Sequence, residues 1–285
     1  MSLVLASEQL RPRFYPELEG ARVLVTGVRE NCGLELGRAF ARHGTNLIAQ
    51  FDEPQDVGFD LADKLENEAF AFRFLQCDFD DVDSITRFSD TAMRAFQGLD
   101  VVINVVGSRF NPLGAGQVAE TEEQLETVVS TELRSAWHMT RQIATRMRDR
   151  GLPATIINAA ILPSSDDPRN LAHRAVLKTA LENIAANHAA EYKNDGIQIN
   201  TVILNADPAI EIDDLDDLMQ VDPVHGALTD ALSSTKVIGD IDFDFSDVSK
   251  PDPVSLDEDD MVAAALFLAS DKGQKFSGLT LSVSR

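Results

Sequence analysis

The chain has 285 residues, of which 44% are hydrophobic, and a formal net charge of -22 at pH 7. This length and apolar content are enough for one large domain with a full core. The acidity argues against nucleic acid and anionic membrane surfaces as partners, because both require clustered Lys and Arg. Apolar runs such as MVAAALFLAS fall short of the roughly 20 residues that cross a bilayer, so we expect no membrane partner.

Cysteine usage and the start of the chain bear on the compartment. Cys32 and Cys77 are too few to suggest a disulfide framework. The first residues lack a basic segment ahead of their short apolar run, which argues against a signal peptide. We therefore expect a cytoplasmic protein. His, Cys and carboxylate residues show no spacing typical of metal ligands, so we predict no metal site.

Short apolar segments alternate with helical segments along most of the chain, which is typical of a parallel sheet with helices on both faces. We expect strands at 21–27, 45–52, 71–79, 99–107, 154–160, 197–204 and 279–285. We expect helices at 34–44, 83–97, 122–151, 171–192 and 257–270, the second capped by Asp83 or Ser84. Continuous Val, Ile and Leu indicate strands buried on both faces. The prediction is a single α/β domain over residues 1–285, with a doubly wound, mainly parallel sheet and an N-terminal extension at 1–17.

An acidic segment at 207–256 interrupts this alternation. Its basic residues are Lys236 and Lys250, against many Asp and Glu. Within it, DIDFDF alternates strictly and would place Ile241 and Phe243 on one face of a strand. Two interpretations stay open: a lid-like insertion that covers another part of the molecule, or a contact edge in an oligomer.

A glycine-rich turn, VLVTGVRENCGLELG, lies between the first predicted strand and the first predicted helix. Backbone N–H groups at a helix N-terminus bind a pyrophosphate when small residues let it approach. The strand, turn and helix context makes this pattern more informative than the glycines alone.

From Leu18 onward the chain resembles the short-chain dehydrogenase/reductase family. The family's TGxxxGxG turn is matched by Thr26, Gly27 and Gly33, with Asn31 in place of the middle glycine. Asn tolerates left-handed backbone angles better than most residues. The motif CDFDD matches the family's acidic residue beside adenine, and NVVG matches its NNAG motif.

The resemblance implies an NAD or NADP cofactor. Asp52, near the end of the second strand, favours NAD slightly because such an acid binds ribose hydroxyls, although the family's own position falls on Phe51. The predicted cofactor site comprises Gly27, Arg29, Asn31, Cys32, Gly33, Asp52, Asp78, Phe79, Asn104, Gly107 and Lys178.

The family's catalytic residues are a tyrosine acid, a serine, a lysine and an asparagine. The helix KTALENIAANHAAEY places Lys178 at the lysine, which puts Arg174 at the tyrosine, Ile161 at the serine and Glu132 at the asparagine. For the serine, Ser164 or Ser165 stays open as an alternative if the loop after the fifth strand is shifted. A guanidinium with a pKa above about 12 cannot donate and regain a proton near neutrality. We therefore expect that standard carbonyl or alcohol hydride transfer has been lost.

The altered positions leave several alternatives open. Arg174 and Lys178 lie four residues apart and repel each other on one helix face, so an anion should accompany them. Either Glu132 pairs with Arg174, or the cations bind a small anionic ligand, a carboxylate or phosphate. The protein could bind a dinucleotide without turnover, be an active NAD(P)-dependent oxidoreductase with non-standard groups, or be a non-catalytic interaction subunit. Family members pair two long helices between subunits, which implies a homo-oligomer, a dimer or tetramer.

Overall fold

The structure is a computed structural model, and it describes residues 2–6, 14–28, 32–51, 65, 69–106, 132–162, 168–205 and 257–284. At 2–6, 168–174, 205, 257–259 and 284 it describes the backbone alone. The predicted acidic insertion therefore lies outside the described residues.

Eight parallel strands of the described chain form one sheet, in the order β1-β8-β7-β6-β5-β2-β3-β4. The strands are β1 (Ser2–Ala6), β2 (Arg22–Val25), β3 (Asn46–Phe51), β4 (Ala71–Gln76), β5 (Val101–Val106), β6 (Ala154–Leu162), β7 (Ile197–Asn205) and β8 (Thr280–Ser284). The helices are α1 (Cys32–Arg42), α3 (Val82–Ala95), α5 (Arg134–Arg150), α6 (Pro168–Glu191) and α8 (Asp257–Ala269). The predicted doubly wound parallel fold is confirmed.

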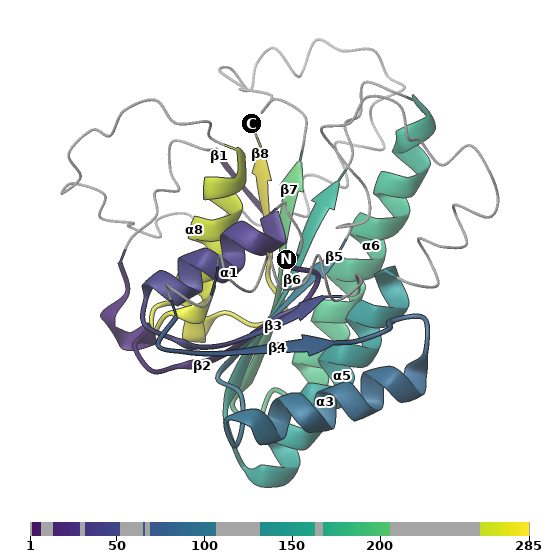
Figure 1. The fold of residues 1–285 in the computed structure, drawn as a ribbon. Helices are drawn as coiled ribbons and strands as arrows, with labels where there is room; N and C mark the ends of the chain where they lie inside the picture. Colours follow the sequence, from purple (N-terminus) through teal and green to yellow (C-terminus); the bar gives the residue numbers. More distant parts are fainter. Residues whose placement is uncertain are drawn as a thin grey trace.

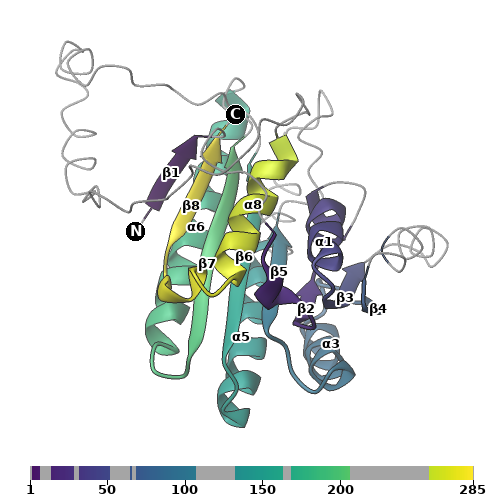
Figure 2. The ribbon, with the colours of Figure 1, turned by 90° about the vertical axis from the view of Figure 1, so that its left-hand side faces the viewer.

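The helices cover both faces of the sheet, with α1 and α8 on one face and α3, α5 and α6 on the other (Figure 1, Figure 2). Successive residues of β2 show how each strand serves both layers. Val23 and Val25 pack in the cluster of α1 and α8, whereas Leu24 packs in the cluster of α3 and α5. All three side chains are fully buried, as a strand between two helical layers requires.

The N-terminal segment contributes an element that the sequence did not predict. Residues 2–6, within the predicted extension, form β1, which pairs in parallel with β8 at the edge of the sheet. The strand is short, and the next described element is the 3-10 turn Pro16–Leu18, which leads into β2. The extension thus adds an edge strand to the sheet.

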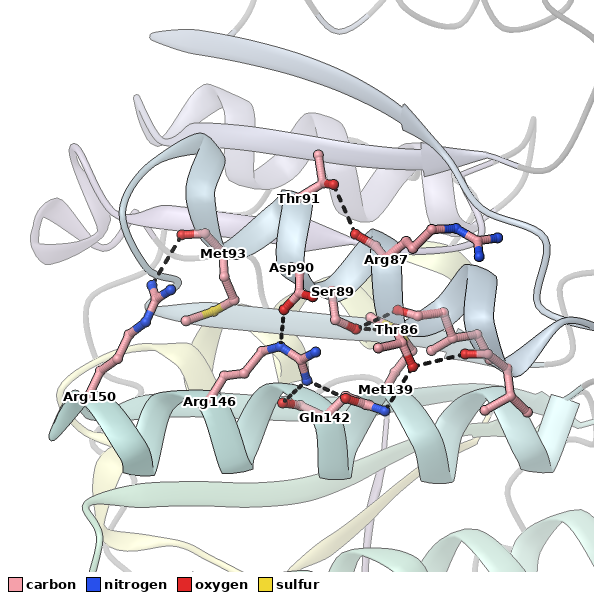
Figure 3. Close-up of polar contacts among 12 residues, drawn as sticks. Thr86, Arg87, Ser89, Asp90, Thr91, Met93, Met139, Gln142, Arg146 and Arg150 are labelled. Carbon is pink, nitrogen blue, oxygen red and sulfur yellow. Dashed lines mark hydrogen bonds and ion pairs between the residues drawn. The ribbon is translucent and has the colours of Figure 1, made fainter.

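Helix α3 packs on α5 through polar side chains as well as apolar ones (Figure 3). Arg146 Nε donates to Asp90 Oδ1 at 2.7 Å, and Gln142 Nε2 donates to Thr86 Oγ1 at 3.1 Å. The predicted N-cap of α3 was wrong. Asp81 is the N-cap, and its carboxylate accepts from the backbone N–H of Asp83 at 2.9 Å, so the helix begins earlier than expected.

No described helix is both long and apolar enough to span a membrane. No group of three or more His, Cys, Asp or Glu among the described residues is arranged to hold a metal ion.

Candidate functional site

The carboxyl ends of β2, β3 and β5 form the edge where a ligand crevice is expected. β2 lies between β3 and β5 in the sheet. The chain leaves β2 through α1 toward β3, and later enters β5 on the other side of β2 through α3, on the opposite face (Figure 1). Ligands of open parallel sheets bind where the strand order reverses in this way.

The glycine-rich turn is anchored to both neighbouring strands. On the β5 side, the N–H of Thr26 donates to the carbonyl of Ile103 at 2.9 Å, and the N–H of Val105 donates to Thr26 Oγ1 at 3.3 Å. Gly27 has φ +64, a left-handed conformation in which glycine is favoured over every other residue. Two predicted turn residues, Arg29 and Asn31, lie outside the described residues.

Gln50 ties the same turn to β3 and β4, and sequence reasoning missed it. Its side chain is fully buried; Oε1 accepts from the N–H of Gly27 at 2.7 Å, and Nε2 donates to the carbonyl of Cys77 at 3.2 Å. A buried amide needs such partners, because leaving it unpaired in the interior is costly. The available signal was one polar residue in the otherwise apolar run LIAQF.

The start of α1 is buried against α8. Cys32 is 1% exposed, and its Sγ lies 3.2 Å from Sδ of Met261 on α8. Gly33 follows as a buried residue of the first turn of α1. Cys32 therefore packs in the core beneath the turn, and Gly33 keeps the helix N-terminus free of a bulky side chain.

The predicted adenine side lies at the end of β4. Asp78 is exposed, and its Oδ1 accepts from the N–H of Asp80 at 2.9 Å, while its own N–H donates to Ser84 Oγ at 3.2 Å. Phe79 is buried and meets Phe88 edge to face at 6.4 Å. Asp78 thus shapes the turn into α3 and still presents its side chain to solvent.

The neighbouring residues at this edge are apolar or inert. Phe51, at the end of β3, stacks on Phe74 with ring centroids 4.0 Å apart, so the family's ribose position holds a phenyl ring. Asp52 lies outside the described residues. Burial raises the pKa of the Cys77 thiol to about 12, which keeps it protonated and unreactive at neutral pH.

Asn104 is held inside the protein. It is 2% exposed, and its Nδ2 donates to Asn158 Oδ1 on β6 at 3.1 Å and to Thr140 Oγ1 on α5 at 3.4 Å. The amide thereby links two strands and a helix below the crevice. Its predicted companion, Gly107, lies outside the described residues.

Two of the expected catalytic positions, Glu132 and Lys178, are next in sequence to Leu133 and Leu177, which pack in one apolar cluster between β6, α5 and α6. That cluster contains Val106, Ala136, Ala160, Leu162, Leu177, Leu181 and Ile203, with Leu133 against it. Glu132 is buried just before α5, Ile161 is buried at the end of β6, and Lys178 is half-buried on α6. The side chain of Arg174 lies outside the described residues.

Ile161, the residue that the sequence aligns with the family's serine, has an aliphatic side chain. It is 5% exposed and packs in the apolar cluster on the α1 and α8 face, together with Val105 and Leu204. An aliphatic side chain in that place can neither donate to a carbonyl nor accept from a hydroxyl.

Neither tyrosine of the chain can supply the missing phenol. Tyr192 is fully buried near the end of α6, where its hydroxyl lies 2.8 Å from Thr145 Oγ1. Tyr15 is buried ahead of β2, 6.3 Å from the ring of His43. Both lie away from the carboxyl edge of the sheet, because Tyr15 precedes the strand that leads there and Tyr192 precedes the turn into β7.

Known proteins match both the sequence and the fold. A family profile described as "Enoyl-(Acyl carrier protein) reductase" matches residues 27–211. The chain belongs to the short-chain dehydrogenase/reductase family. It is 23% identical over 269 residues to 3beta-hydroxysteroid dehydrogenase 1 of Eggerthella lenta, and the matched region covers 94% of each chain.

Solved structures of the family share the fold. A hydroxysteroid dehydrogenase from Escherichia coli superposes with a TM-score of 0.64 at 20% identity, covering 98% of each chain. A short-chain dehydrogenase from Burkholderia cenocepacia J2315, solved in complex with NADP, gives a TM-score of 0.63 at 20% identity, covering 94% of this chain and 97% of that one.

Proposed function

We propose that this family member binds a nicotinamide dinucleotide and does not perform standard hydride transfer, so that the bound dinucleotide has a regulatory or structural role. The observation that carries the proposal is the absence of a tyrosine at the expected position: the sequence has Arg174 there, and its two tyrosines, Tyr15 and Tyr192, are buried elsewhere. Guanidinium cannot replace a phenol as a proton donor.

Retention of a dinucleotide is supported by the glycine turn. Gly27 keeps its left-handed conformation, and hydrogen bonds from the turn to β3 and β5 hold it below the start of α1. A helix N-terminus reached through such a turn favours a phosphate group. Of the residues that would hold the dinucleotide, Asp78 is exposed at the predicted adenine side and Lys178 is half-buried near the predicted nicotinamide side.

The test is calorimetric titration of the full chain with NAD+, NADH, NADP+ and NADPH. We expect binding of at least one dinucleotide, abolished in Gly33→Trp, where an indole would block the approach to the α1 N-terminus. Because Asp52 is near the ribose position, we expect NAD to bind somewhat more tightly than NADP.

A second assay follows nicotinamide absorbance with a panel of ketones, aldehydes and alcohols. We expect no redox change above the rate without protein. Turnover that disappears in Lys178→Ala would replace this proposal with the alternative of an active oxidoreductase that uses non-standard groups. Absence of any dinucleotide binding would leave the interaction subunit as the remaining alternative.

The cationic pair at the catalytic positions suggests what else the site could hold. We propose that Glu132 neutralises Arg174, with a small carboxylate or phosphate ligand near Arg174 and Lys178 as the competing alternative. Glu132 is 5% exposed, and a buried carboxylate needs a cation or donors around it. If Glu132 pairs with Arg174, Glu132→Gln should therefore lower the stability of the protein. If the substitution leaves the two cations uncompensated, the variant should bind added phosphate more tightly than wild type.

The outer face of α5 favours assembly as a homo-oligomer. Trp137 is 38% exposed, with the guanidinium of Arg141 above its ring at 5.3 Å and His188 of α6 at 6.0 Å. Among the described residues, neither Arg134 nor Arg141 has an acidic partner, in a chain whose net charge is -22. Exposed Trp with Arg is the composition of interface centres.

Sedimentation velocity tests this assembly. Trp137→Glu should shift the protein to smaller species if the α5 face is the contact between copies. Val82→Glu, on α3, is a matched control because Val82 is also 38% exposed and should leave the sedimentation coefficient unchanged. A wild-type protein that sediments as a monomer would refute the assembly.

A further inference from the structure

Gln50 occupies a place where one side chain reaches the ends of three strands. It belongs to β3, it accepts from the N–H of Gly27 beyond the end of β2, and it donates to the carbonyl of Cys77 beyond the end of β4. Both bonds are buried. The donor and the acceptor of this amide are therefore both committed to backbone groups of the segments that follow β2 and β4, directly under the glycine-rich turn.

The backbone N–H groups at the start of the turn also form hydrogen bonds within the protein. Thr26 donates its N–H to Ile103, Gly27 donates to the Gln50 side chain, and Val28 donates to the Gln50 carbonyl at 2.9 Å. None of these three N–H groups is available to a ligand. The turn therefore reaches its ligand-facing part with its first three residues already fixed by the protein.

This arrangement gives Gln50 influence over the left-handed conformation at Gly27. The bond from the Gly27 N–H to the buried amide fixes the orientation of the peptide unit that leads into Gly27, whose φ is +64. Without the amide, Gly27 N–H and the Cys77 carbonyl would each be buried without a partner. Other turn conformations would then compete with the one observed.

We propose that Gln50 is a positioning residue of the dinucleotide site: its side-chain amide holds the glycine-rich turn in the conformation that receives the pyrophosphate. The inference rests on the proposed dinucleotide binding and adds the residue that prepares the site for it. Gln50 does not contact the ligand; it acts through Gly27. Preorganisation of this kind raises affinity because the free protein already populates the binding conformation.

A matched control exists in the other half of the sheet. Asn200 on β7 is also fully buried, and its amide also bridges two backbone groups: Nδ2 donates to the Phe276 carbonyl at 3.0 Å, and Oδ1 accepts from the N–H of Leu279 at 3.0 Å. β7 is four strands from β3 in the sheet order, about 19 Å at normal strand spacing. Asn200→Leu therefore removes an equivalent pair of bonds far from the turn.

The experiment compares Gln50→Met with Asn200→Leu in the full chain. Both variants should have lower denaturation midpoints in urea. We expect Gln50→Met to weaken dinucleotide binding roughly tenfold, as it would if the competent turn fell to about a tenth of the population, with Asn200→Leu within about twofold of wild type. Hydrogen exchange at the Gly27 amide should quicken in Gln50→Met alone, with or without ligand.

Gln50→Glu gives a pH signature that simple loss of packing would not. The ionised carboxylate accepts from Gly27 but repels the Cys77 carbonyl oxygen, whereas the protonated carboxyl can accept from one and donate to the other. Dinucleotide affinity relative to wild type should therefore recover as the pH falls. If Gln50→Met does not fold, Gln50→Glu still tests whether Gln50 positions the turn.

The outcomes separate the two proposals. If wild type binds a dinucleotide and Gln50→Met binds as well, or if Asn200→Leu loses as much affinity, Gln50 has no positioning role and the proposed function stands. If wild type binds none of the four dinucleotides, the proposed function fails and this inference fails with it.

Discussion

The ion pair between Arg22 and Asp100 should be one of the larger side-chain contributions to stability at the amino-terminal edge of the sheet. Asp100 Oδ2 accepts from Nε of Arg22 at 2.9 Å and from its backbone N–H at 2.8 Å, and Oδ1 accepts from Nη2 at 2.6 Å. Asp100→Ala removes all three bonds between the approach to β5 and the start of β2.

The magnitude follows from the number of bonds and their exposure. A hydrogen bond to a charged group contributes about 1.5–3 kcal/mol when buried. The side chains here are 25% and 39% exposed, so water replaces part of each interaction after the substitution. We expect a loss of about 2–3 kcal/mol in the free energy of unfolding, measured by urea denaturation at neutral pH. A loss below about 0.5 kcal/mol would refute the reasoning, because it would class this pair with ordinary surface ion pairs.

The same pair gives a pH dependence with a definite sign. Burial raises the pKa of Asp100, but the hydrogen bonds from Arg22 more than offset it, so the pKa lies below the usual range. A carboxylate whose pKa is depressed in the folded state stabilises that state fully at pH values above its unfolded pKa of about 3.9. This stabilisation is lost as the pH falls through the folded-state pKa. The difference between wild type and Asp100→Ala should be constant near neutrality and shrink below about pH 4. A difference that stays constant in acid would contradict this.

Three further predictions concern the packing around the site. Tyr192→Phe leaves the hydroxyl of Thr145 without its partner and should cost about 1–2 kcal/mol in urea denaturation, with no change in dinucleotide affinity. Gly273→Ala would place a Cβ 2.4 Å from the carbonyl oxygen of Leu268 and should lower the melting temperature by several degrees, about 1–3 kcal/mol of overpacking. Asp90→Asn removes the negative charge that pairs with Arg146 and should cost less than about 1 kcal/mol, an effect that salt reduces further.

The fold could be predicted from the sequence because its strands are buried on both faces. A strand such as VVINVV must be apolar nearly throughout, so it is distinct from the amphipathic helices on either side of it. The strand β1 was not predicted because only five residues at an edge form it, and their pattern resembles any short apolar run. The N-cap of α3 was misplaced because Asp81 and Asp83 are both acceptable caps, and only the backbone geometry distinguishes them.

The candidate site was predictable where it depends on motifs and not where it depends on long-range contacts. Gly27 and Lys178 could be placed from spacing along the chain. Gln50 could not, because its partners Gly27 and Cys77 are 23 and 27 residues away and nothing local requires an amide there. A polar residue inside a buried strand is a useful signal only once its neighbours in space are known.

The two halves of the proposed site depend on different kinds of chemistry, so dinucleotide binding can be retained where hydride transfer is lost. The described part of the glycine-rich turn is held through the backbone N–H groups of Thr26, Gly27 and Val28, and a side-chain difference such as Asn31 for glycine does not remove these donors. Hydride transfer needs a particular side chain with a tunable proton, and Arg174 and Ile161 offer none. Dinucleotide binding and catalysis are therefore separable in this fold, and measuring both on the same preparation distinguishes loss of chemistry from loss of the site.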